Sequence, residues 1–69
     1  MIGIFKTNIN TQQDKNTVVN AIAGHFNPTA CTVDLEDCDR VLRVVGHQLE
    51  EEQLISFVRS LGYHCSQLD

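Results

Sequence analysis

Hydrophobic and polar positions alternate over the first nine residues of the chain. Phe5, Thr7 and Ile9 fall on one face of an extended segment, whereas Ile2 and Ile4 fall on the other. A period of two residues is typical of a strand with one buried face. We therefore predict a strand at the N-terminus, with Ile2 and Ile4 on its second face.

A helical period follows this strand. Apolar residues recur at three- and four-residue spacing, which predicts a helix; they are Val18, Val19, Ile22 and Phe26. Thr11 lies three residues before Asp14, a spacing that suits an N-cap and the first turn of this helix. Gly24 is expected to end the helix in the left-handed conformation.

The second half of the chain shows strand-like and helix-like patterns in turn. Cys31, Val33 and Leu35 alternate with polar residues, and an acidic turn at 36–39 separates them from an apolar run at 41–45. This predicts a β-hairpin with an acidic tip. Three glutamates at 50–52 suit the positive end of a helix dipole. The apolar stripe of that helix is Leu54, Phe57, Val58 and Leu61, with Gly62 as its stop and a short β-prone segment at 63–68.

The predicted order is strand, helix, strand, strand, helix, strand. The economical packing is an α+β, ferredoxin-like βαββαβ sandwich, with a four-stranded antiparallel sheet and both helices on one face. A length of 69 residues allows one domain, residues 1–69. The other sheet face would then be open, and we expect Ile2 and Ile4 to lie on it.

Charge and composition exclude several classes of function. The net charge is −4, from nine acidic and five basic residues. Nucleic acids and anionic membranes require clustered Lys and Arg, so neither is expected as a partner. No run approaches the roughly 20 apolar residues of a membrane span, and residues 1–9 lack the features of a signal peptide. Three widely spaced cysteines form no disulfide framework. We expect reduced thiols and a cytoplasmic protein.

The order of these segments resembles the heavy-metal-associated domain of copper chaperones and metal-transporting ATPases. The resemblance covers nearly the whole chain. It rests on Phe5-x-Thr7-x-Ile9 before a helix, on Val33-Asp34-Leu35, on Leu42-Arg43-Val44-Val45-Gly46, and on the closing Leu61-Gly62-Tyr63.

In that family a loop of pattern Met-x-Cys-x-x-Cys binds a soft ion such as Cu(I) at the start of the first helix. By this resemblance Ile9 takes the Met position, while Thr11 and Asp14 take the two Cys positions. Hydroxyl and carboxylate oxygens are hard donors and poor ligands for a soft ion. The resemblance thus implies the fold without the metal, and also that Tyr63 lies close to Thr11 and Asp14.

The sequence also contains other groups of potential metal ligands. Asp14 and His64, with His25 as a third donor, are the alternative site for a divalent ion such as zinc. However, His64 and Cys65 should point to opposite sides of a strand, and His25 lies near the far end of the first helix. The carboxylates at 36–39 lack the spacing of a calcium loop, and no nucleophile or acid/base motif is present.

The expected function is therefore contact with a protein rather than catalysis, with no cofactor. The family's docking region would correspond to Ile9, Thr11, Asp14, Lys15 and Tyr63. Two alternatives remain open: metal binding through oxygen and nitrogen donors, and ligand sensing or self-association through the open sheet face. The expected oligomeric state is a monomer or a weak homodimer.

Overall fold

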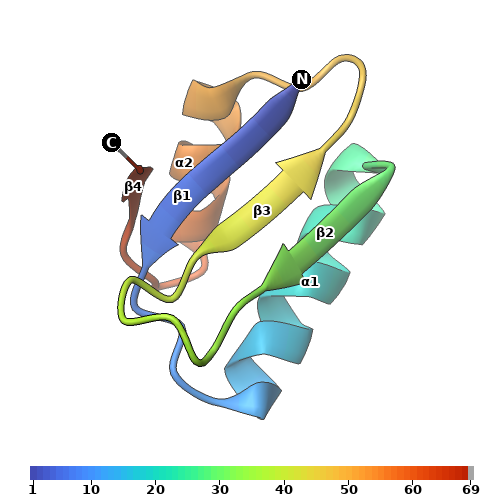
Figure 1. The fold of residues 1–69 in the computed structure, drawn as a ribbon. Coiled ribbons are helices and arrows are strands. Elements are labelled where there is room, and N and C mark those ends of the chain that lie inside the picture. The colour runs from blue at the N-terminus through green and yellow to red at the C-terminus, as the bar shows by residue number, and fades with distance from the viewer. Residues whose placement is uncertain (69) are drawn as a thin grey trace.

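The computed structural model describes residues 1–68 and contains one four-stranded sheet and two helices. The strands are β1 (Ile2–Thr7), β2 (Ala30–Val33), β3 (Leu42–Val45) and β4 (Cys65–Gln67). The helices are α1 (Gln12–Phe26) and α2 (Glu51–Ser60). The predicted order of elements is confirmed, including the hairpin formed by β2 and β3 (Figure 1).

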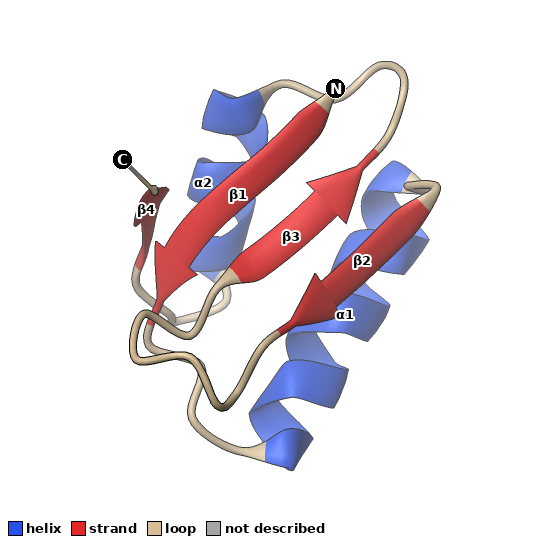
Figure 2. Cartoon of the chain, in the orientation of Figure 1, coloured by secondary structure: helices blue, strands red, loops and turns tan. Residues whose placement is uncertain are grey.

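The strands lie in the order β2-β3-β1-β4, and all neighbours are antiparallel. β3 therefore lies between β1 and β2. Leu42 of β3 pairs with Phe5 of β1 on one side and with Val33 of β2 on the other. Both helices lie behind this sheet in Figure 2 and leave its other face uncovered. The predicted α+β class, with two helices and a four-stranded antiparallel sheet, is confirmed.

The core lies between the sheet and the helices, because every second residue of β1 points toward them. Phe5 is fully buried, whereas Ile2 and Ile4 are 58% and 38% exposed on the open face. This confirms the assignment of the two faces from the alternation. The buried hydrophobic residues are Phe5, Ile9, Val18, Ile22, Val33, Leu42, Val44, Leu54, Val58 and Cys65.

Helix α1 begins as predicted but ends later than predicted. Thr11 is the N-cap, and its Oγ1 accepts a hydrogen bond from the Asp14 N–H at 3.0 Å. The prediction that Gly24 ends the helix is wrong. The left-handed residue is Asn27, with φ 53°, and its N–H donates to the Ala23 carbonyl. Asparagine adopts this conformation more readily than most residues, so the helix can extend through Phe26.

Helix α2 starts after Glu50, whose side chain forms no capping hydrogen bond. Its first turn contains Glu51 and Glu52, which suit the positive end of the helix dipole. The helix ends before Leu61, and Gly62 follows with φ +100°, a conformation that favours glycine. The predicted stop at Gly62 is confirmed, and the chain turns there into β4. Within residues 1–68, no helix has the length and apolar character needed to cross a bilayer.

Candidate functional site

The loop between β1 and α1 is fastened to the rest of the fold through Thr7. The Thr7 N–H donates to the Asp39 carbonyl at 3.0 Å, and its hydroxyl donates to the Arg40 carbonyl. The same hydroxyl oxygen accepts a hydrogen bond from the Ile9 N–H at 3.2 Å. This polar side chain is only 8% exposed, so these bonds satisfy it where water cannot. They hold the start of the loop against the end of the β2–β3 hairpin.

Ile9 does not belong to an exposed surface. Its exposed fraction is 0%, and it is part of the central core cluster. Including Ile9 among the exposed docking residues is therefore wrong. The bond from its N–H to Thr7 turns the chain inward after β1, so the apolar side chain fills the core instead of facing a partner.

Thr11 and Asp14, the two positions that match the family's cysteines, both take part in local hydrogen bonds. Thr11 Oγ1 accepts from the Asp14 N–H and caps α1. Asp14 Oδ1 accepts a hydrogen bond of 2.8 Å from the Tyr63 hydroxyl. The expected closeness of Tyr63 and Asp14 is confirmed. Each side chain thus has a structural role that requires no metal.

The Asp14 carboxylate changes the pKa of the Tyr63 hydroxyl. Its hydrogen bond to Asp14 raises the pKa of Tyr63 above the ordinary value, and partial burial and the negative charge of Asp14 act in the same direction. A phenol that donates to a carboxylate loses this bond on ionisation, so the neutral form is favoured. The pair links the start of α1 to the turn before β4, 49 residues later.

His64 and Cys65 point to opposite sides of the chain, as predicted. His64 is exposed, and Cys65 is 2% exposed and faces the core. The His64 N–H donates to Asn8 Oδ1 at 2.8 Å, which gives the β1–α1 loop a second link to the segment before β4. This bond uses the backbone and leaves the imidazole free to contact solvent.

The alternative zinc ligands do not form a three-residue cluster. His25 stacks on Phe57 of α2, with ring centroids 4.7 Å apart, at the end of α1 opposite to Asp14. Across residues 1–68, Asp37, Cys38 and Asp39 make up the one group of three potential ligands with all ligand atoms within 4.8 Å of one another.

That acidic group forms the tip of the β2–β3 hairpin. Asp37 Oδ1 accepts from the Asp39 N–H at 2.8 Å, and Asp34 Oδ1 accepts from the Glu36 N–H at 3.0 Å. Asp39 also lies 3.7 Å from Lys6 Nζ. Side chains that bond to the backbone two residues later are typical of tight turns, so these contacts account for the carboxylates as turn residues.

None of the three cysteines belongs to the loop between β1 and α1 that would carry the family's ligands. Cys31 is half-buried on β2, Cys38 is exposed at the hairpin tip, and Cys65 is buried on β4. Burial raises the pKa of both Cys31 and Cys65 to about 11, so these two remain protonated near neutral pH. Soft metals bind thiolates, and burial at Cys31 and Cys65 disfavours the thiolate form.

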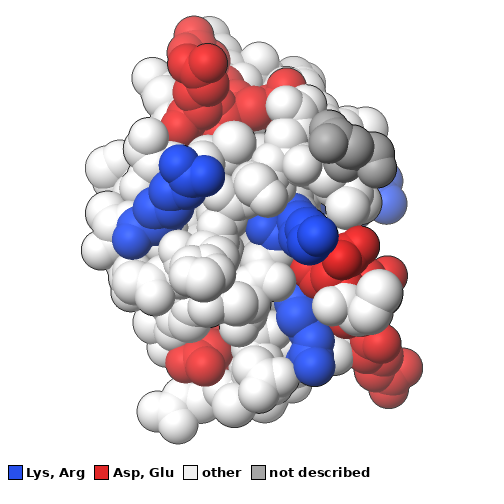
Figure 3. Space-filling view, turned by 90° about the vertical axis from the view of Figure 1, so that its left-hand side faces the viewer, with Lys and Arg blue, Asp and Glu red and all other residues white. Residues whose placement is uncertain are grey.

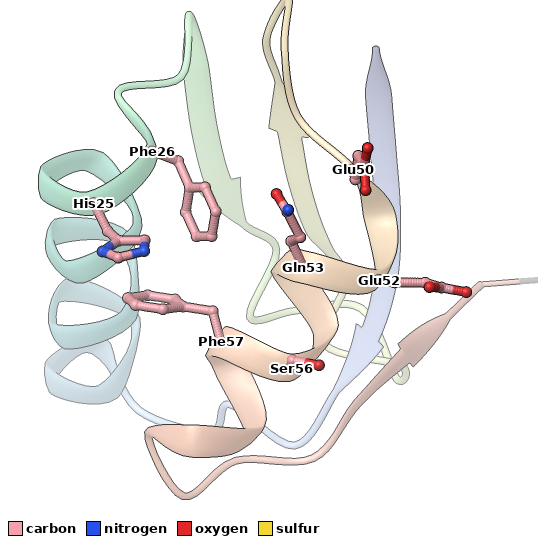
Figure 4. A pocket seen from close by; sticks show the side chains of 7 residues that line it. All are labelled: His25, Phe26, Glu50, Glu52, Gln53, Ser56 and Phe57. Carbon is pink, nitrogen blue, oxygen red and sulfur yellow. The ribbon is translucent and has the colours of Figure 1, made fainter.

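Two contacts, one between a helix and a strand and one between the two helices, have no signal in the sequence pattern. Arg59 of α2 donates from Nε to the Cys65 carbonyl at 3.0 Å. His25 and Phe26 of α1 pack with Phe57 of α2 beside a hollow of about 640 Å³, as Figure 4 shows. The rings point toward one another across the two helices, so the cluster joins the helices. The aromatic rings of the two helices are far apart in sequence and meet only through tertiary packing.

No protein-family model, curated protein or solved structure matches this chain. The resemblance to heavy-metal-associated domains therefore gains no support from these searches.

Proposed function

We propose that the chain is a heavy-metal-associated-like domain that has lost its soft-metal site and acts as a non-catalytic protein-interaction module. We also propose that its fold is ferredoxin-like. Two features support the fold: the βαββαβ order, and the position of β3 between β1 and β2.

The single observation that carries this proposal is the hydrogen bonding at positions 11 and 14. Thr11 caps α1, and Asp14 accepts from the Tyr63 hydroxyl. Both positions offer hard oxygen donors where the family has thiolates, and both donors already have partners. A loop built in this way keeps its shape without an ion, which favours a role in contact rather than in metal transfer.

The docking surface in this proposal is formed by Thr11, Asp14, Lys15 and Tyr63. Thr11 is exposed and the other three are partly exposed, while Ile9 lies beneath them in the core. The bond from Tyr63 to Asp14 holds two separate segments in one arrangement. A pre-organised surface costs less conformational entropy when a partner binds.

A comparison of charge-reversal variants on the two sides of the molecule tests this surface. The wild-type chain, Lys15→Glu and Arg43→Glu are immobilised and exposed to extract from the source cells. Arg43 is on β3, among the outward positions of the sheet, so its reversal is a matched control. We expect a protein that binds the wild type and Arg43→Glu but is lost with Lys15→Glu. Capture that is insensitive to Lys15→Glu would argue against this surface.

A second candidate function is self-association through the open sheet face. The observation in its favour is the exposure of Ile2 and Ile4 on adjacent outward positions of β1. Their burial against a second copy would be favourable. Sedimentation of the wild type and of Ile4→Lys at increasing concentration tests it. A concentration-dependent dimer that the variant abolishes supports this function, and a monomer at all concentrations removes it.

A further inference from the structure

A small hollow lies between the last turn of α2 and β4. Its volume is about 300 Å³. The residues that line it are Arg59, Tyr63, His64, Cys65 and Ser66. None of them is acidic, although the whole chain has a net charge of −4.

Arg59 is held in a defined orientation at this hollow. Its Nε–H donates to the Cys65 carbonyl at 3.0 Å, in a partly buried contact. A guanidinium carries five N–H donors, so this bond leaves the two terminal NH₂ groups. Over residues 1–68, Lys6 and Asp39 form the one ion pair of the structure. The charge of Arg59 is therefore not neutralised by a described carboxylate.

Covering the edge of the sheet explains the position of Arg59 but not the other side chains that line the hollow. β4 is an edge strand of the sheet, and the bond from Nε satisfies one of its carbonyl groups. Two other lining side chains can donate hydrogen bonds: the imidazole of His64 and the hydroxyl of Ser66. His64 is exposed, and the Ser66 hydroxyl has no hydrogen-bond partner within residues 1–68.

The side of the molecule that carries α2 and β4 has charges of both signs. Figure 3 shows basic side chains across its middle, with acidic side chains above, below and beside them. Asp14 accepts a hydrogen bond from the hydroxyl of Tyr63, one of the lining residues. A guanidinium that is held in place and has no described carboxylate partner is suited to bind an oxyanion.

From these contacts we infer that the hollow binds a small oxyanion, a phosphate or carboxylate group, between the Arg59 guanidinium and the His64 imidazole. The NH₂ groups of Arg59 donate to two oxygens of the anion. His64 and the Ser66 hydroxyl donate from the other side. This site adjoins the proposed docking surface at Tyr63, which lines the hollow as well. Arg59, His64 and Ser66, which would hold the anion, lie outside that surface.

A titration of the ¹⁵N-labelled protein, followed by NMR, tests the site. Inorganic phosphate and acetate are added separately, with chloride keeping the ionic strength constant, because exposed charges respond to salt alone. We expect saturable shifts of the amides of residues 59 and 63–66. The anion with the lower dissociation constant shows whether the site prefers phosphate or carboxylate.

Three variants separate a specific site from general charge attraction. Arg59→Gln should weaken binding at least tenfold. His64→Gln, at an exposed position that should not affect folding, should weaken it severalfold. Arg43→Gln removes the same charge from β3 and should bind as the wild type does. Shifts that do not saturate with either anion, wild-type affinity in His64→Gln, or an equal loss in Arg43→Gln would each overturn the inference.

Discussion

The Tyr63 hydroxyl donates a 2.8 Å hydrogen bond to Asp14 Oδ1 and so joins the first turn of α1 to the turn before β4. These are the two segments that, in the resembled family, lie on either side of the metal. Here a phenol and a carboxylate connect them directly. The contact is the observation on which we base the proposal of a loop without a metal site.

Asp14→Asn should lower the pKa of Tyr63 toward its ordinary value. Asp14 raises this pKa through the hydrogen bond and through its negative charge, and the amide removes the charge. Tyr63 is the only tyrosine and the chain has no tryptophan, so ultraviolet titration reports this group alone. A variant with an unchanged pKa would show that the contact is absent in solution.

The same pair predicts a loss of stability in alkali. The folded-state pKa of Tyr63 is raised, so an unfolded chain releases this proton first as the pH rises. The stability from the contact is fully present below pH of about 10, the ordinary pKa of tyrosine. It is lost as the pH rises through the raised folded-state pKa. Urea unfolding of the wild type and Tyr63→Phe across this range should show a smaller decline in the variant.

Thr11→Ala should destabilise the protein by about 1 kcal/mol, the usual effect of losing an N-cap side chain. Thr17→Ala is the matched control, because Thr17 is exposed in the middle of α1 and donates only to the Gln13 carbonyl. Alanine is the better helix former, so the control should be neutral or slightly stabilising. Urea unfolding measures both, and equal effects would contradict the cap.

Ile9→Val and Ile2→Val compare a buried with an exposed isoleucine. Ile9 is 0% exposed and Ile2 is 58% exposed. Loss of one buried methylene should cost about 0.5–1.5 kcal/mol at Ile9 and less than about 0.5 kcal/mol at Ile2. Equal free energies of unfolding for the two variants would indicate that Ile9 is exposed and not part of the core.

The sequence predicts the order of the elements well because each element carries a local period. The faces of β1 follow from alternation, and the cap at Thr11 follows from its spacing to Asp14. The end of α1 was misplaced because glycine is a frequent helix terminator, whereas here Asn27 ends the helix, and Phe26 before it packs against Phe57 of α2. That packing is tertiary and leaves no local signal.

The candidate site is predicted less completely than the fold, because its contacts join segments that no local pattern brings together. The closeness of Tyr63 and Asp14 followed from the family resemblance and not from any periodicity. Ile9 was placed on the surface by the same resemblance, yet the Thr7 hydroxyl turns it inward. Arg59 and the Cys65 carbonyl meet across a turn whose geometry no residue pattern specifies.

Introducing two cysteines at positions 11 and 14 should create a soft-metal site if the loop has the geometry of the resembled family. In a Cys38→Ser background, Thr11→Cys with Asp14→Cys should bind one Cu(I) per chain, because a helix N-terminus favours thiolates. Thr17→Cys with Asn20→Cys is the control, with the same spacing at exposed positions within α1. It should bind Cu(I) at least tenfold more weakly in competition with a chelator. Equal affinities would count against the resemblance.

Native mass spectrometry of the wild-type chain after incubation with Cu(I) and with Zn(II) tests the central claim most directly. The Thr11→Cys/Asp14→Cys variant serves as the positive control for loading. We predict that the wild type retains only its metal-free mass with both ions. A one-to-one complex with either ion that disappears in Asp14→Asn or His64→Gln would contradict the claim that this loop has lost its metal site.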